Sequence, residues 1–148
     1  MIEEGIGIMA STDDLGFLLS RASGLVVRAT NAALADSGLR VRAYSVLDLA
    51  CRTPEGMSQR DLAGVLGLDP SQVVQLVDEL ASAGLVERLP SPTDRRAKLV
   101  AGTPRGRRIL EQAAVLAAAG QQQQLGCLSE EEQASLRSML SRVIHFSG

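Results

Sequence analysis

Two short amphipathic segments separated by a tight turn lie in the middle of the chain, and they constrain the fold more than any other feature. In the first, Ser58 and Asp61 have the spacing of a capping box, in which side chains satisfy the free amides of a helix start. Its apolar residues end at Gly67, a residue type that ends helices in a left-handed conformation. Asp69 then caps a second helix with Pro70 in its first turn, where the missing N–H costs nothing. Two short helices joined in this way predict a helix-turn-helix.

A β-hairpin is predicted directly after the second helix. Apolar and charged residues alternate over residues 85–89, which is typical of a half-buried strand. Residues 91–96 are rich in turn-forming and charged side chains, and residues 98–101 then have the pattern of a returning strand. A hairpin in this position is a wing, so the sequence predicts a winged helix-turn-helix.

Longer helical segments flank this region. A stripe of Leu, Ala and Val at steps of three and four predicts a helix over residues 15–36, after a capping-box spacing from Ser11 to Asp14. Further helices are predicted over residues 41–52 and from Thr103 to about residue 126. A last helix follows the capping box of Ser129, and its apolar residues are expected to face inward: Leu136, Leu140, Val143 and Ile144. The 22 Leu and 19 Ala of the chain also favour helix, so the fold class is mostly α with a small β-hairpin wing.

The charge is unevenly distributed along the chain. The formal net charge of −2 gives no sign of a nucleic-acid partner. Residues 85–110, however, hold seven basic side chains against two acidic ones, so this stretch carries +5 and the remainder −7. Since phosphate neutralisation requires localised cations, the distribution indicates DNA binding where the total does not.

Several motifs of the chain resemble those of the MarR (multiple antibiotic resistance regulator) family of bacterial transcription factors. The most specific is Asp94-Arg95-Arg96-Ala97-Lys98 followed by Thr103-Pro104-Arg105-Gly106; Ser58–Ala63, Leu68–Leu80 and Gly84–Arg88 also match. The resemblance covers nearly the whole chain. It implies three parts: an N-terminal dimerisation helix (1–40), a winged helix-turn-helix DNA-binding domain (41–106) and C-terminal dimerisation helices (107–148).

The resemblance implies that double-stranded DNA is a partner and assigns roles to particular side chains. The wing tip would enter the minor groove with Arg96, which Asp94 positions, and Arg95 and Lys98 would bind beside it. Off the apolar face of the second helix, Ser71, Gln72 and Gln75 are expected to reach base edges in the major groove. Arg60 and Arg42 are candidates for phosphate contacts.

The chain departs from the family pattern in two places. Gly102 stands where the family usually has Leu before the helix-capping Thr. The predicted recognition helix has no basic residue, and Asp78 and Glu79 give it a charge of −2. We therefore expect the wing and its flanks to bind phosphate while the uncharged polar side chains of the helix read bases. The acidic helix also supports an alternative, a winged-helix interaction or ligand-sequestering module that has lost operator binding.

The family resemblance further implies a homodimer with a small-molecule effector. The candidate effector-binding residues are Phe17, Tyr44 and Cys51, which favour a hydrophobic or aromatic compound. Cys51 is expected to be a buried thiol and Cys127 a more exposed one.

Other classes of protein lack their sequence signals. Nothing resembles a catalytic set or a phosphate-binding loop, and the lone His145 has no metal-ligand spacing around it, so neither enzyme activity nor a cofactor is expected. No apolar run is long enough to span a membrane, and residues 1–10 do not resemble a secretory signal. A cytoplasmic protein without membrane contact is the expectation.

Overall fold

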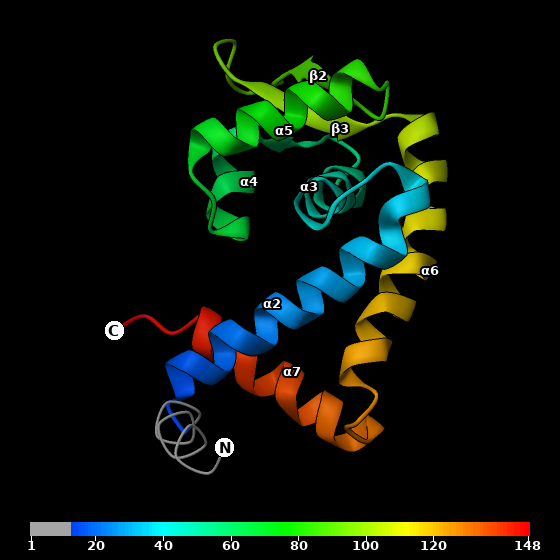
Figure 1. Ribbon diagram of the computed structural model, residues 1–148. Coiled ribbons are helices and arrows are strands. Elements are labelled where there is room, and N and C mark those ends of the chain that lie inside the picture. The colour runs from blue at the N-terminus through cyan, green and yellow to red at the C-terminus, as the bar shows by residue number, and fades with distance from the viewer. Residues whose placement is uncertain (1–12) are drawn as a thin grey trace.

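The fold is taken from a computed structural model, which describes residues 13–148 of the chain. Two regions are visible in Figure 1: a winged lobe that contains α3, α4, α5 and the sheet, and a set of longer helices in which α2 and α6 cross and α7 follows α6. The elements run in the order α2 (Leu15–Leu34), η1 (Ala35–Ser37), α3 (Val41–Arg52), β1 (Met57–Ser58), α4 (Gln59–Leu66), α5 (Pro70–Ser82), β2 (Val86–Pro90), β3 (Lys98–Gly102), α6 (Pro104–Leu125) and α7 (Glu130–Ile144).

Local capping signals set the helix boundaries, as the sequence predicted for most of them. The Ser58 hydroxyl accepts the Asp61 amide at 3.1 Å at the start of α4, and Gly67 ends that helix with φ +64°. Ser129 and Glu132 cap α7 reciprocally. The first helix begins differently from the prediction: its cap is Asp14, whose carboxylate accepts the Phe17 amide at 2.9 Å, while Ser11 lies outside the described residues.

The sheet has three antiparallel strands in the order β1-β3-β2 rather than the predicted two. The added strand β1 has only two residues, with Met57 opposite Val100 and Ser58 opposite Leu99. Gly56 precedes it with φ +87°, and a Cβ there would lie 2.6 Å from the Val100 carbonyl oxygen. A glycine at this position therefore allows the chain to enter the sheet.

The core fills the winged lobe and extends to the long helices through Leu34 of α2 and Ala113 and Ala117 of α6. Its fully buried large side chains come from the end of α2 and from α3, α4, α5 and β3: Leu34, Val46, Leu47, Leu62, Val73, Val77 and Val100. Burying each of these side chains contributes about 1.5–3 kcal/mol. The helix α5 and the wing are thereby fixed to the same core.

The helices α2 and α6 cross closely, and their contact continues this core. Gly120 of α6 is buried there, and a Cβ on it would lie 2.9 Å from atoms of Ala29, Thr30 and Ala33. Ala113 and Ala117 are buried on the same face of α6. The small side chains let the two helices approach within backbone contact.

The apolar face of α7, which the sequence predicts to be buried and the resemblance assigns to the dimerisation helices, is not covered within the single chain. No residue of α7 is buried; Leu136 is half-buried, and Leu140, Val143 and Ile144 are exposed. The first turns of α2 are similarly open, with Leu15 75% exposed. The physical reason is that no other described element of the chain covers these faces. Among the helices of residues 13–148, none is both long and apolar enough to cross a membrane.

Candidate nucleic-acid interface

The helix α5 presents a polar face on the side opposite the core. Val73, Val77 and Leu80 are buried, while Ser71, Gln72 and Gln75 are all exposed. The first two polar side chains are engaged at the helix start. The Asp69 amide donates to Oε1 of Gln72 at 3.2 Å, and the Ser71 hydroxyl donates to the Asp69 carboxylate.

Gln75 differs from these two side chains. Within residues 13–148 the side-chain amide of Gln75 has no hydrogen-bond partner, so its NH₂ group and its carbonyl oxygen can both face a ligand. Gln with this freedom can make a bidentate pair with adenine. Of the three polar residues predicted on this helix, Gln75 is therefore the one that the fold leaves most available for reading a base.

The two acidic residues of α5 are both directed to other parts of the lobe. Nη2 of Arg88 on β2 donates to Oδ1 of Asp78 at 2.6 Å. Glu79 lines two hollows on the side of α5 toward α3. The ion pair with Arg88 therefore offsets one of the two negative charges that Asp78 and Glu79 give to the helix. Because Arg88 is paired with Asp78, it is not one of the cations that are free to bind phosphate.

The wing turn is held by hydrogen bonds to its own backbone. The Ser91 hydroxyl accepts the Thr93 and Asp94 amides at 3.3 and 3.2 Å. Asp94 Oδ1 accepts the backbone amide of Arg96 at 2.9 Å. Asp94 thus shapes the turn through the main chain of Arg96, and among residues 13–148 its carboxylate forms no ion pair with the Arg96 guanidinium group.

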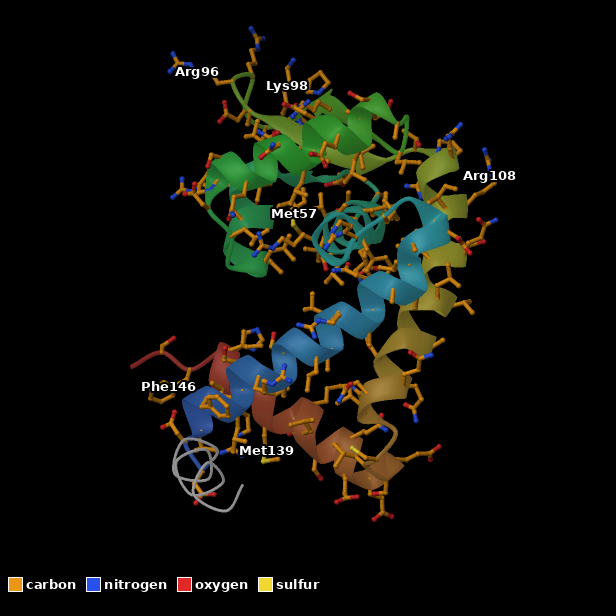
Figure 2. All side chains as sticks on the ribbon, in the orientation of Figure 1. Met57, Arg96, Lys98, Arg108, Met139 and Phe146 are labelled. Atoms are coloured by element: carbon orange, nitrogen blue, oxygen red, sulfur yellow. The ribbon has the colours of Figure 1, made fainter. Side chains whose placement is uncertain are left out.

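The cations of the wing are exposed. Arg95, Arg96 and Lys98 are all accessible to solvent, and Figure 2 shows Arg96 and Lys98 projecting outward from the hairpin. In the described part of the chain, none of the three side chains is in an ion pair. Their charge is available to a phosphate.

The basic stretch is not one patch in space. Arg108 projects from the start of α6, on the side of the lobe away from the wing tip (Figure 2). The +5 of residues 85–110 therefore divides between the wing and the start of α6. Arg60, in the first turn of α4, is exposed, whereas Arg42 lines a hollow beside α2 and α3.

The Thr-Pro-x-Gly motif joins the winged lobe to α6. The Thr103 hydroxyl accepts the Gly106 amide at 2.9 Å and donates to the Gly84 carbonyl at 2.7 Å. The Thr103 amide also donates to the Leu85 carbonyl at 3.0 Å. The motif caps α6 and at the same time ties it to the end of the recognition helix.

Two hollows lie between the recognition helix and the long helices. The larger, of about 860 Å³, is lined by residues of α2, of the segment from Gly38 into the start of α3, of the end of α4 with the turn after it, and of α5: Val27, Asn31, Gly38, Arg40, Val41, Arg42, Ala43, Ser45, Leu66, Gly67, Leu68, Leu76 and Glu79. The smaller, of about 220 Å³, lies beside Ala83, Leu85 and Arg105 and shares Gly38, Ala43 and Glu79 with the first.

The three residues predicted to bind an effector are not brought together. None of them lines either hollow within the described residues. Phe17 lies near the beginning of α2, about 21 Å of helix rise from Asn31. Tyr44 and Cys51 are half-buried against the core from α3. The lining residues Asn31 and Arg40 carried no signal in the sequence, because they meet only after the chain folds.

Tyr44 and Cys51, both half-buried on α3, have raised pKa values. Burial raises the pKa of the Cys51 thiol, and nearby Arg107 partly offsets this effect. Burial, followed by the charge of Asp48, raises the pKa of Tyr44. Cys51 also explains Gly102, because a Cβ at that position would overlap the Cys51 sulfur and lie 3.3 Å from the Cys51 Cβ. Cys127 is exposed, as predicted.

Known proteins are similar to this chain over both the winged lobe and the flanking helices. A model of the MarR family matches residues 37–97. A transcriptional regulator (MarR family) from Rhodococcus sp. RHA1 is 46% identical with a TM-score of 0.87, and the match covers 90% of this chain and 94% of that one. CouR from Rhodococcus jostii RHA1, bound to p-coumaroyl-CoA, is 45% identical with a TM-score of 0.84, with coverage of 93% and 96%. A mutant of MarR from Escherichia coli, complexed with operator DNA, is 31% identical with a TM-score of 0.77, with coverage of 87% and 92%.

Proposed function

The chain belongs to the MarR family of transcriptional regulators, and from this premise we propose that it is a homodimeric repressor that releases its operator when a small molecule binds. The observation that carries the proposal is the wing, where Arg95, Arg96 and Lys98 are exposed, together with the exposed side-chain amide of Gln75 on α5. Cations free of internal partners supply phosphate affinity, and the amide supplies base recognition. A relative of this chain, a mutant of Escherichia coli MarR, has been solved with operator DNA.

We propose that a second copy of the chain packs against the exposed apolar faces of α2 and α7. Leu18 and Leu19 of α2 are 44% and 48% exposed, and Val143 and Ile144 of α7 are 66% and 72% exposed. A single chain leaves an amphipathic helix, α7, without a buried residue. Large exposed apolar faces mark association sites. Two winged lobes on one dimer would bind two half-sites of a pseudo-palindrome, which multiplies affinity and specificity.

The larger hollow is the proposed effector site, in place of the three residues proposed from the sequence. Its walls come from both regions of the molecule, and Leu76 and Glu79 belong to the recognition helix itself. A compound that binds there can change the setting of α5 if it favours one arrangement of the two regions over the other. Arg40 and Arg42 at this hollow favour an anionic compound with an apolar part, and the CouR complex makes p-coumaroyl-CoA the first compound to test.

The test is binding of the full chain to DNA from upstream of its own gene, with random-sequence DNA of equal length as competitor. We expect a discrete complex that survives the competitor at physiological salt and that an effector dissociates. The alternative, an interaction module without operator binding, rests on the acidic recognition helix, and the Asp78–Arg88 pair weakens that support. Equal affinity for upstream and random DNA would favour the alternative and overturn the proposal.

A further inference from the structure

One guanidinium group joins three elements of the winged lobe. Nε and Nη2 of Arg88 donate to Oε1 of Gln59 at 3.1 and 2.9 Å. Nη2 also donates to Oδ1 of Asp78 at 2.6 Å. Gln59 begins α4, Asp78 lies in the recognition helix α5, and Arg88 belongs to the wing strand β2. We call Gln59, Arg88 and Asp78 the Arg88 link.

The Arg88 link connects parts of the lobe that the backbone joins only indirectly. The strand order β1-β3-β2 puts Arg88 on one edge of the sheet, and Gln59 follows the strand on the other edge. Arg88 and Met57 both face Val100 of the central strand in the register. The side chain of Arg88 therefore reaches from the wing strand toward the start of α4 and up to α5, so that three separate elements share one set of hydrogen bonds.

Asp78 places the attachment point on the reading face of α5. Ser71, Gln75 and Asp78 are spaced four and three residues apart, so they follow one line along the helix surface. The Asp78 side chain is 60% exposed and that of Arg88 only 28% exposed. A shift of the wing strand is therefore passed to α5 one turn from Gln75.

The geometry of the guanidinium group suits a positioning role better than a phosphate contact. Arginine has planar donors with fixed directions, so a fork that is engaged on two sides holds its partners at a set distance and angle. Part of that fork already serves a carboxylate and an amide oxygen. A phosphate at Arg88 would have to compete with the Asp78 carboxylate for the same donors.

We propose that Arg88 is a positioning residue that sets the recognition helix relative to the wing, so that Gln75 and Arg96 meet adjacent grooves together. The inference rests on the proposed function as a DNA-binding regulator. It assigns to Asp78 a role that its charge alone would not suggest, because a carboxylate on a DNA-facing helix repels phosphate.

The sharpest test compares two acidic residues of the winged lobe. Asp78→Asn and Glu87→Gln each remove one negative charge from the lobe, but only Asp78→Asn weakens the Arg88 link. Glu87 is exposed on β2 and lines neither hollow, so it serves as the control. Simple electrostatics would strengthen DNA binding in both variants. We expect Asp78→Asn to bind its specific site about 10-fold more weakly than the wild type while random DNA is bound equally or better, and Glu87→Gln to lose no specificity.

A second comparison separates positioning from phosphate binding. The probes are the duplex that the wild-type chain selects from a random-sequence library and random DNA of equal length, each titrated over a salt series. We expect Arg88→Gln to lose specific affinity about 10-fold with the salt slope unchanged. Lys98→Gln should weaken both duplexes alike and reduce the slope by about 0.9, because one phosphate is no longer neutralised. In the double variant Arg88→Gln with Asp78→Asn, the second change should add less than about 2-fold, since the link is already broken.

Three results would overturn the proposal. Unchanged specific affinity in both Asp78→Asn and Arg88→Gln would exclude a positioning role. Equal losses on both duplexes with a smaller salt slope would make Arg88 a phosphate contact. If the wild-type chain selects no sequence at all, the proposed function fails and this inference fails with it, and that outcome is seen before any variant is measured. Thermal unfolding of each variant, with Asp78→Asn as the milder change, checks that the fold is retained.

Discussion

The contact between Gly106 and Leu85 gives a stability prediction that can be worked from distances. Gly106 is buried in the first turn of α6, and a Cβ there would overlap the Leu85 carbonyl oxygen and lie 2.9 Å from its carbonyl carbon. Both are backbone atoms, so no side-chain rotation relieves the overlap. The substitution Gly106→Ala must move α6 away from the end of α5, and with it the hydrogen bonds of Thr103 to Gly84 and Leu85.

The expected loss of stability is the sum of one stabilising and two destabilising effects. Alanine gains up to about 1 kcal/mol over glycine inside a helix. Forcing a methyl group into a filled site costs about 1–3 kcal/mol, and each weakened hydrogen bond costs about 1 kcal/mol more. We therefore expect the free energy of unfolding to fall by about 2 kcal/mol, which lowers Tm by about 4–8 °C in a domain of this size.

Gly64 provides the matched control, since it also lies inside a helix but a Cβ there would meet nothing within 4 Å. Gly64→Ala should raise Tm by about 2–4 °C, the opposite sign for the same chemical change. Thermal unfolding of wild type and both variants is compared at one protomer concentration, because the stability of the proposed dimer depends on concentration. A Gly106→Ala variant as stable as the wild type would refute the reasoning about the α5–α6 junction.

Two further predictions concern the dimer and the thiols. Ile144→Glu should leave the fold intact but yield a monomer in sedimentation velocity at micromolar concentration, whereas Val65→Glu, at a residue on α4 that is 60% exposed, should remain a dimer; a dimeric Ile144→Glu would contradict the assigned face. Cys127 should react with a thiol reagent well before Cys51, whose reaction should need higher pH because burial raises its pKa above the ordinary 9.0; equal rates in Cys127→Ser and Cys51→Ser variants would show that Cys51 is not shielded.

Features encoded by neighbouring residues could be predicted from the sequence. The left-handed Gly67, the start of α5 at Pro70 and the Ser129–Glu132 cap depend on residues within one turn of each other. The winged helix-turn-helix followed from these signals, and the similar solved structures confirm it. Periodicity also gave α3 its observed bounds.

Features that depend on long-range contacts could not be predicted in this way. The strand β1 has two residues and no alternation to detect, and it exists because Val100 pairs with Met57. Arg88 was counted as a free cation because its partners Gln59 and Asp78 lie 29 and 10 residues away. The lining of the larger hollow comes from four separate segments. The apolar periodicity of α7 was identified correctly, but periodicity does not tell whether the covering surface belongs to the same chain.

In the proposed function, the exposed wing is the main source of DNA affinity. The decisive measurement is equilibrium binding of wild type and Arg96→Ala to DNA from upstream of the chain's own gene at two salt concentrations. We expect the wild type to protect a discrete site and Arg96→Ala to lose that footprint, with at least about 10-fold weaker binding and a salt slope smaller by about 0.9 for each phosphate that is no longer neutralised. An Arg96→Ala variant that binds the site with unchanged affinity and unchanged salt dependence would contradict the assignment of the wing.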